Sequence, residues 1–200
     1  MKFKYIGTLI IFSLLFTSLQ AQKFRMGATA GVNFANISGS ELGTGQKFDN
    51  LDPRTSFHLG IVSELFLGGK FYLGPEILYS SQGGKQDEKE LVLNYIQIPI
   101  MARYYFTDGL NVEIGPQLGY LLSSSGELND ERISRDNFMK SDFSFAFGLG
   151  YKMNNGFFLR GRYFLGTNVA ESRESIITGD QVIDYEYFNK VAQVSMGYMF

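Results

Sequence analysis

The stretch FSFAFGLGYK, residues 143–152, decides the fold class, because large apolar side chains alternate along it with small or polar ones. A period of two is typical of a β-strand whose two faces meet different surroundings. The same alternation recurs in seven further segments: 24–35, 55–67, 70–81, 91–106, 110–123, 156–167 and 191–200. Segments of about ten residues have the length that a tilted strand needs to cross a bilayer.

The connections between these segments alternate in length. Three are short and contain glycine, namely Gly68-Gly69, Asp108-Gly109 and Asn154-Asn155-Gly156, and they predict hairpin turns. The other four are longer and polar: 36–54, 82–90, 124–142 and 168–187. Outer-membrane barrels have short periplasmic turns and long outer loops. An even number of strands then places both chain termini in the periplasm.

The apolar face of these segments is expected to point outward. It carries the large residues of every segment, and a closed ring of eight strands leaves an interior only wide enough for side chains. Lipid does not tolerate an open sheet edge, so the sheet must close. The sequence therefore predicts an all-β fold, an eight-stranded antiparallel up-and-down transmembrane β-barrel. A soluble, lipocalin-like barrel with a ligand inside is the alternative.

The first residues predict export. Lys2 and Lys4 precede an apolar run over 6–19, and Ala21 offers a small residue for cleavage. The run is shorter than the roughly 20 residues of a spanning helix. We therefore expect a cleaved signal peptide over 1–21 and a barrel domain over 22–200, located in the outer membrane of a Gram-negative bacterium. Outer-membrane lipid and lipopolysaccharide would surround it.

Composition excludes several kinds of chemistry. The chain has no cysteine and one histidine, so it has no disulfide framework, no thiol nucleophile and no multi-histidine metal site. The formal net charge is -2, which gives no basic field for nucleic acid. No motif implies a cofactor.

Charged residues on the inward face form a predicted lumen charge network. Its members are Arg25, Glu64, Glu76, Arg103, Glu113, Lys152, Arg160 and Arg162. We favour ion pairs that fill a narrow lumen over a selective polar channel. Pro75, Pro99 and Pro116 also fall inside predicted strands, where they predict bulges because proline lacks a backbone donor.

Ser56 and His58 share the inward face of one segment and could belong to a hydrolytic site with Asp52 or Glu186 as the acid. Such a site in a lipid-modifying enzyme must face lipid or the outer rim, and the lipid face shows no polar cluster. We therefore expect a non-enzyme, in which His58 is hydrogen-bonded to the barrel wall.

The long connections together hold 16 acidic and 8 basic residues. We interpret them as solvated loops bridged by cations in the lipopolysaccharide layer, with binding of divalent cations or a cationic partner as the alternative. At the other end of the barrel, Tyr198 and Phe200 resemble the terminal-strand signal that the outer-membrane insertion machinery reads.

Residues 71–79 and 112–120 share a Gly-Pro pattern, FYLGPEILY against VEIGPQLGY, at an offset of 41 residues. With Met26-Gly27, Tyr95-Ile96-Gln97-Ile98-Pro99 and Gly197-Tyr198-Met199-Phe200, the chain resembles the PorT-like outer-membrane β-barrel family, often labelled porin family proteins. The resemblance implies an eight-stranded outer-membrane barrel, and one branch of the family is linked to a protein-secretion apparatus. It supplies no catalytic or binding motif.

We therefore expect a monomeric protein of structural or interaction type. Its long outer loops would engage a partner, such as a secretion component or a surface protein. A narrow pore or transporter for small solutes is the first alternative, and a lipid A-modifying enzyme is the second.

Overall fold

The computed structural model describes residues 24–41, 47–49, 52–86, 89–128, 131–132, 141–170, 176–178, 181–183 and 185–200. The predicted signal peptide lies outside these residues. Within them, no helix has the length and apolar character needed to span a bilayer.

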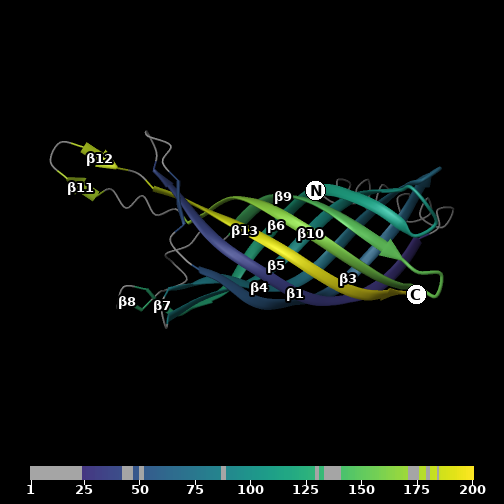
Figure 1. Ribbon diagram of the computed structural model, residues 1–200, viewed down its shortest axis with the longest axis horizontal. Helices are drawn as coiled ribbons and strands as arrows, with labels where there is room; N and C mark the ends of the chain where they lie inside the picture. The colour runs from purple at the N-terminus through teal and green to yellow at the C-terminus, as the bar shows by residue number, and fades with distance from the viewer. Residues whose placement is uncertain are drawn as a thin grey trace, which may run out of the picture.

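Eight long strands form one closed antiparallel barrel (Figure 1). They are β1 (Phe24–Glu41), β3 (Asp52–Gly68), β4 (Phe71–Gln86), β5 (Lys89–Tyr105), β6 (Leu110–Ser125), β9 (Ser141–Lys152), β10 (Phe157–Ala170) and β13 (Tyr185–Met199). Each pairs with the next along the chain, and β13 pairs with β1. The predicted fold class is confirmed.

Five short strands lie in the long connections. They are β2 (Lys47–Asp49), which pairs with β1, and two small hairpins, β7 (Glu127–Leu128) with β8 (Glu131–Arg132), and β11 (Ile176–Thr178) with β12 (Gln181–Ile183). Figure 1 shows both hairpins at the end of the barrel opposite to the C-terminus. We call these the loop end and the turn end.

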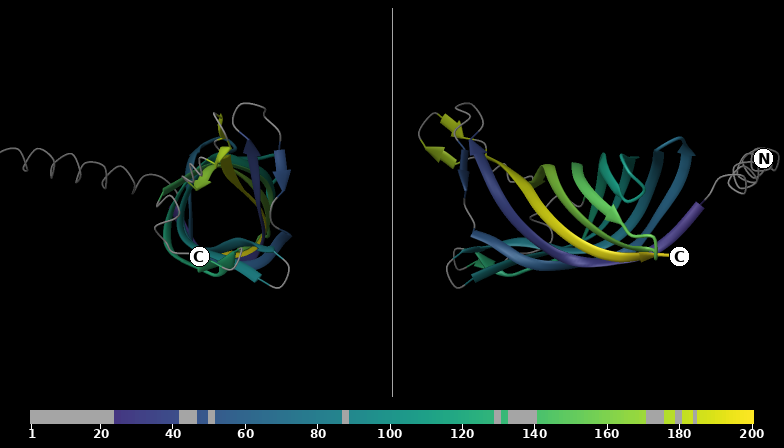
Figure 2. Two further views of the ribbon diagram at one scale, coloured as in Figure 1. Left: turned by 90° about the vertical axis from the view of Figure 1, so that its left-hand side faces the viewer. Right: turned by 45° about the vertical axis from the view of Figure 1, so that its right-hand side comes forward.

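The seam between the first and last strands is fully hydrogen-bonded. β1 and β13 pair without a register shift from Gly27 opposite Met199 to Glu41 opposite Tyr185. Beyond this ladder, the backbone N–H of Phe200 donates to the carbonyl of Met26 at 2.7 Å. The view along the barrel in Figure 2 shows the resulting closed ring of strands.

The two faces of the wall are inverted relative to a soluble barrel. Large apolar side chains are exposed on the outside, among them Ile114, Leu149 and Met196, each more than 60% exposed. Polar and charged side chains such as Glu113 and Gln193 are buried inside. The predicted outward direction of the apolar face is confirmed, and it excludes the lipocalin-like alternative.

The strands are longer at the loop end than the alternation predicted. They contain 12 to 18 residues each, more than the roughly 9–11 that cross a bilayer. The expected loop over 82–90 is mostly strand, because β4 continues to Gln86 and β5 begins at Lys89. These extensions carry the wall beyond the hydrocarbon layer.

The predicted bulges at Pro75, Pro99 and Pro116 are wrong. The pairs Val62–Glu76 and Leu65–Leu73 flank Pro75 in one unbroken register, and the pairs on either side of Pro99 and Pro116 likewise keep their register. Shifts occur elsewhere, for example between Asn94 and Tyr95.

Side chains compensate for the donor that Pro75 lacks. The register places Ser63 opposite Pro75, so the Ser63 carbonyl has no backbone N–H across from it. Arg103 donates from Nη1 to this carbonyl at 3.0 Å, and Ser63 donates from Oγ to the carbonyl of Pro75 at 2.6 Å. The ladder is therefore bridged at the proline without an extra residue.

The last strand generates a test of the insertion signal. Phe200 and Phe24 both expose their rings at the turn end, but only Phe200 belongs to the expected signal. Replacing Phe200 with alanine should lower the fraction of protein assembled into the outer membrane, measured by heat-modifiable gel mobility of membrane fractions. The Phe24→Ala variant is the control, and equal assembly of both variants would refute the signal.

Candidate functional site

A buried charge cluster crosses the middle of the lumen. Glu76 and Glu113 lie at its centre, and their side chains have no exposed surface. Arg162 donates to both carboxylates, at 2.6 Å to Glu76 and 2.5 Å to Glu113. Arg160 reaches Glu76 at 2.8 Å, and Arg103 bonds Glu113 at 2.9 Å and also pairs with Glu76. Each acid is thus shared by several guanidinium groups.

A second, smaller group lies nearer the turn end. Glu64 accepts hydrogen bonds from Lys152 at 2.5 Å and from the Tyr105 hydroxyl at 2.6 Å. Arg103 lies 3.7 Å from the same carboxylate and so joins the two groups. Its guanidinium contacts Glu64, Glu76 and Glu113.

Alternation and glycine together bring these side chains into contact. Arg103 and Glu113 are direct partners on β5 and β6, whereas Glu113 and Arg162 are separated by β9, where Gly148 faces both. A Cβ at position 148 would lie 2.9 Å from Arg162 Cγ. A Cβ at Gly74 would lie 2.5 Å from the Arg103 guanidinium carbon. Glycine therefore allows charged groups to meet across an intervening strand.

The burial of the cluster has an electrostatic consequence. Four cationic and three acidic side chains are almost completely buried, with side-chain exposures from 0% to 13%. Removing ions from water costs several kcal/mol each, so such groups persist only when paired and hydrogen-bonded. A solute crossing this layer would have to break those pairs.

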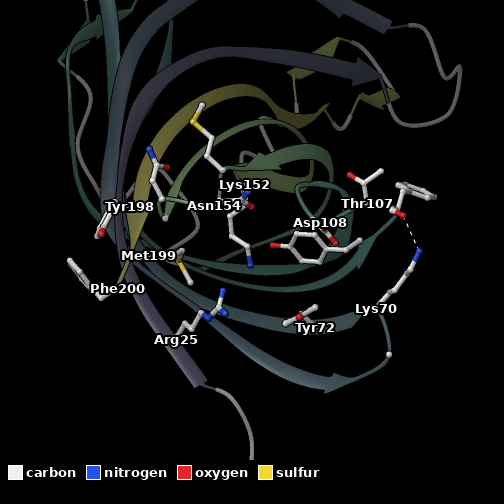
Figure 3. Close-up of a pocket in the computed structure, with 16 residues that line it drawn as sticks. Arg25, Lys70, Tyr72, Thr107, Asp108, Lys152, Asn154, Tyr198, Met199 and Phe200 are labelled. Atoms are coloured by element: carbon white, nitrogen blue, oxygen red, sulfur yellow. Dashed lines mark hydrogen bonds between the residues drawn. The ribbon is translucent and has the colours of Figure 1, made fainter.

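Arg25 does not join the network. The register sets it opposite Glu64, but Glu64 is bonded to Lys152 and Tyr105. The Arg25 side chain is exposed and lines a cavity of about 800 Å³ at the turn end (Figure 3). The structure thus brings together seven of the eight residues of the predicted network and places the eighth at the mouth of the barrel.

His58 is buried in the wall with partners other than those considered from the sequence. Its Nδ1 lies 2.6 Å from Asn33 Oδ1, and its Nε2 lies 2.7 Å from Ser195 Oγ. Ser56 donates instead to the carbonyl of Ser81 at 2.6 Å. Asp52 is exposed at the end of its strand, and the side chain of Glu186 lies outside the described residues.

The contacts of Asn33 fix the tautomer of His58. The Asn33 amide nitrogen lies 2.8–3.0 Å from three acceptors, the carbonyls of Phe57 and Ser81 and the hydroxyl of Ser80. Its oxygen therefore faces His58, so Nδ1 carries the proton and Nε2 accepts from Ser195. This is the arrangement of a serine, a general base and an orienting group. His58 is only 1% exposed, however, which denies a substrate access.

Gly31 makes this contact possible. It lies on β1 between His58 of β3 and Ser195 of β13, and a Cβ there would lie 2.6 Å from His58 Cε1. The alternation along 24–35 and 191–200 assigns Asn33 and Ser195 to the inward face, but it does not identify them as partners of His58. Ser195 is 137 residues away from His58 and is its neighbour only across the closed seam.

The charge cluster yields a stability prediction. Glu113→Gln would leave Arg103 and Arg162 incompletely paired in the lumen, which should cost about 3–5 kcal/mol. Urea unfolding of the protein in detergent, followed by circular dichroism, should show a clearly lower midpoint.

Glu90→Gln is the matched control at the loop end. Hydrogen bonds from Lys85 and Arg54 hold the pKa of Glu90 below its usual range, so this change also removes a charge. The side chains of Glu90 and Lys85 are more than 40% exposed and screened by water, and Arg54 keeps its hydrogen bonds to Ser81 and Gln82, so the midpoint should barely move. Equal midpoints for Glu113→Gln and Glu90→Gln would contradict a sealed, dry cluster.

The close packing around Gly31 yields a second stability prediction. Gly31→Ala should destabilise the barrel by about 1–3 kcal/mol, because the new methyl group would clash with the carbonyl oxygen of Val194 and lie 2.6 Å from His58 Cε1. Gly161→Ala is the control, since a Cβ there would meet no atom within 4 Å. The same unfolding assay measures both, and a Gly31→Ala variant as stable as Gly161→Ala would rule out the close packing around His58.

Two solved structures are similar to the chain. The chain is similar to Neisserial surface protein A, with a TM-score of 0.53 and 12% identity over 88% of this chain and 97% of that one. Ail, the attachment invasion locus protein of Yersinia pestis, gives a TM-score of 0.47 and 12% identity over 88% and 99% of the two chains. No curated protein sequence matches the chain.

At these identities the similarity concerns the fold alone. A family model, the outer membrane protein beta-barrel domain, matches residues 20–168, which include six and most of a seventh of the eight long strands. With a closed barrel, an apolar outer face and this match in place, the chain belongs to the outer membrane protein beta-barrel domain family and is an outer-membrane protein.

Proposed function

We propose that this protein is a sealed outer-membrane barrel of structural or interaction type, and that it does not conduct solutes. The observation that supports the proposal is the charge cluster of Glu76, Glu113, Arg103, Arg160 and Arg162 across the lumen. An open pore needs a hydrated path, whereas these side chains are bonded to one another and excluded from solvent.

The loop end is the proposed interaction surface. The strands continue there past the thickness of the hydrocarbon layer, and the long connections between them carry the excess of acidic residues. A rigid wall that raises such loops above the membrane can present them to a partner. A component of a secretion apparatus is the partner that the PorT-like resemblance favours.

The proposed orientation follows from the two ends of the barrel. Short turns and both described chain ends share the turn end, while the small hairpins lie at the loop end. In outer-membrane barrels the short turns face the periplasm. We therefore place both termini in the periplasm and the loop end outside the cell.

Planar-bilayer recording tests the sealed lumen. Purified protein is first reconstituted into liposomes, and co-flotation with the lipid establishes that it has inserted. Inserted protein should give no steady single-channel current, because every ion would have to displace a buried ion pair. Reproducible steady currents from inserted protein would overturn the proposal and favour a narrow pore or transporter.

A further inference from the structure

The mouth at the turn end contains two cations outside the buried ion pairs, Arg25 and Lys70, beside Lys152, which is paired with Glu64. Its cavity of about 800 Å³ is lined by Arg25, Lys70 and Lys152. Asp108 is the one acidic side chain among the described residues that line it. Figure 3 shows Arg25 and Lys152 pointing toward one another across the opening. Like charges that converge on an open cavity create a potential that attracts an anion.

The nearest buried acid is already engaged. Glu64 accepts from Lys152 and Tyr105 below the cavity, and within the part of the chain that the structure describes, Arg25 has no ion pair. Lys70 donates to the carbonyl of Phe106 at 2.9 Å on the rim. The guanidinium of Arg25 therefore keeps its donors directed at the cavity.

Aromatic rings form the wall beside these cations. Tyr72 and Tyr105 pack edge to face with their centroids 5.0 Å apart. The Lys152 ammonium lies 4.6 Å from the Tyr105 ring centroid and 5.4 Å from that of Tyr72. These cation–π contacts hold Lys152 in place at the floor of the cavity.

We propose that the turn-end mouth is a binding site for an oxyanion, a carboxylate or phosphate group attached to a flat apolar moiety. Arg25 would bind two of its oxygens with its planar fork of donors. Lys152, whose ammonium also binds Glu64, would donate a further hydrogen bond, and the Tyr72 and Tyr105 rings would contact the apolar moiety. The proposed site depends only on residues at the turn-end mouth. It requires neither a sealed lumen nor a particular side of the membrane.

Binding of small aromatic anions tests the site. The full folded barrel, in a non-ionic detergent, is titrated with sodium benzoate, with phenyl phosphate and with neutral benzamide, using saturation-transfer NMR for contact and calorimetry for affinity. Both anions should bind saturably and more weakly as salt is added, and benzamide should not. The tighter of the two anions identifies the carboxylate or the phosphate as the natural group.

Two charge-removing variants separate the mouth from the rest of the surface. Arg25→Gln should lower the binding affinity for both anions by at least about tenfold, the loss expected for a charged hydrogen-bonded contact. Lys85→Gln removes an exposed cation at the loop end and should leave both affinities unchanged. Unboiled gel mobility establishes that each variant is folded.

Three results would overturn the proposal. The first is benzamide binding as tightly as benzoate, which would make the mouth merely apolar. The second is an equal effect of Arg25→Gln and Lys85→Gln, which would indicate attraction to the whole surface. The third is the absence of saturable binding by either anion to folded wild-type protein.

Discussion

The ion pairs that join Glu76 and Glu113 to three arginines are the interaction on which the rest of this barrel depends. A ring of eight strands has an interior about as wide as the side chains that fill it, and this chain fills it with charge rather than with hydrocarbon. Other interior residues fit around these charged groups. Gly74 and Gly148 leave room for the guanidinium groups, and Tyr105 and Lys152 saturate the remaining acid, Glu64.

The same cluster also completes the backbone hydrogen bonding of the barrel wall. A proline in a closed barrel leaves a carbonyl without a partner, and no free edge exists to absorb the defect. Arg103 supplies the missing donor to Ser63 while it pairs with Glu76 and Glu113. Interior electrostatics and backbone pairing are therefore coupled at one residue, which explains how the strand keeps its register through Pro75.

Much of this architecture could be predicted from the sequence, because alternation reports which face a residue occupies. That information placed Glu76, Arg103 and Arg162 inside the barrel. It could not predict that Arg25 stays outside the network or which residues bond to His58, since both depend on register and on which strands meet at the seam. It also underestimated strand length at the loop end, where residues such as Gln82, Gly83 and Gly84 show no alternation of apolar and polar side chains.

The cluster also constrains how the barrel enters the membrane. Arg162 on β10 is paired with Glu76 on β4, 86 residues earlier in the chain. Among the network residues, the β3–β4 hairpin carries only acids and the β9–β10 hairpin carries only cations. Either of these two hairpins, entering hydrocarbon alone, would bring unpaired ions with it, at a cost of several kcal/mol for each. The strands must therefore assemble around their charges before or while they leave water, and bilayer insertion and barrel closure become one concerted event.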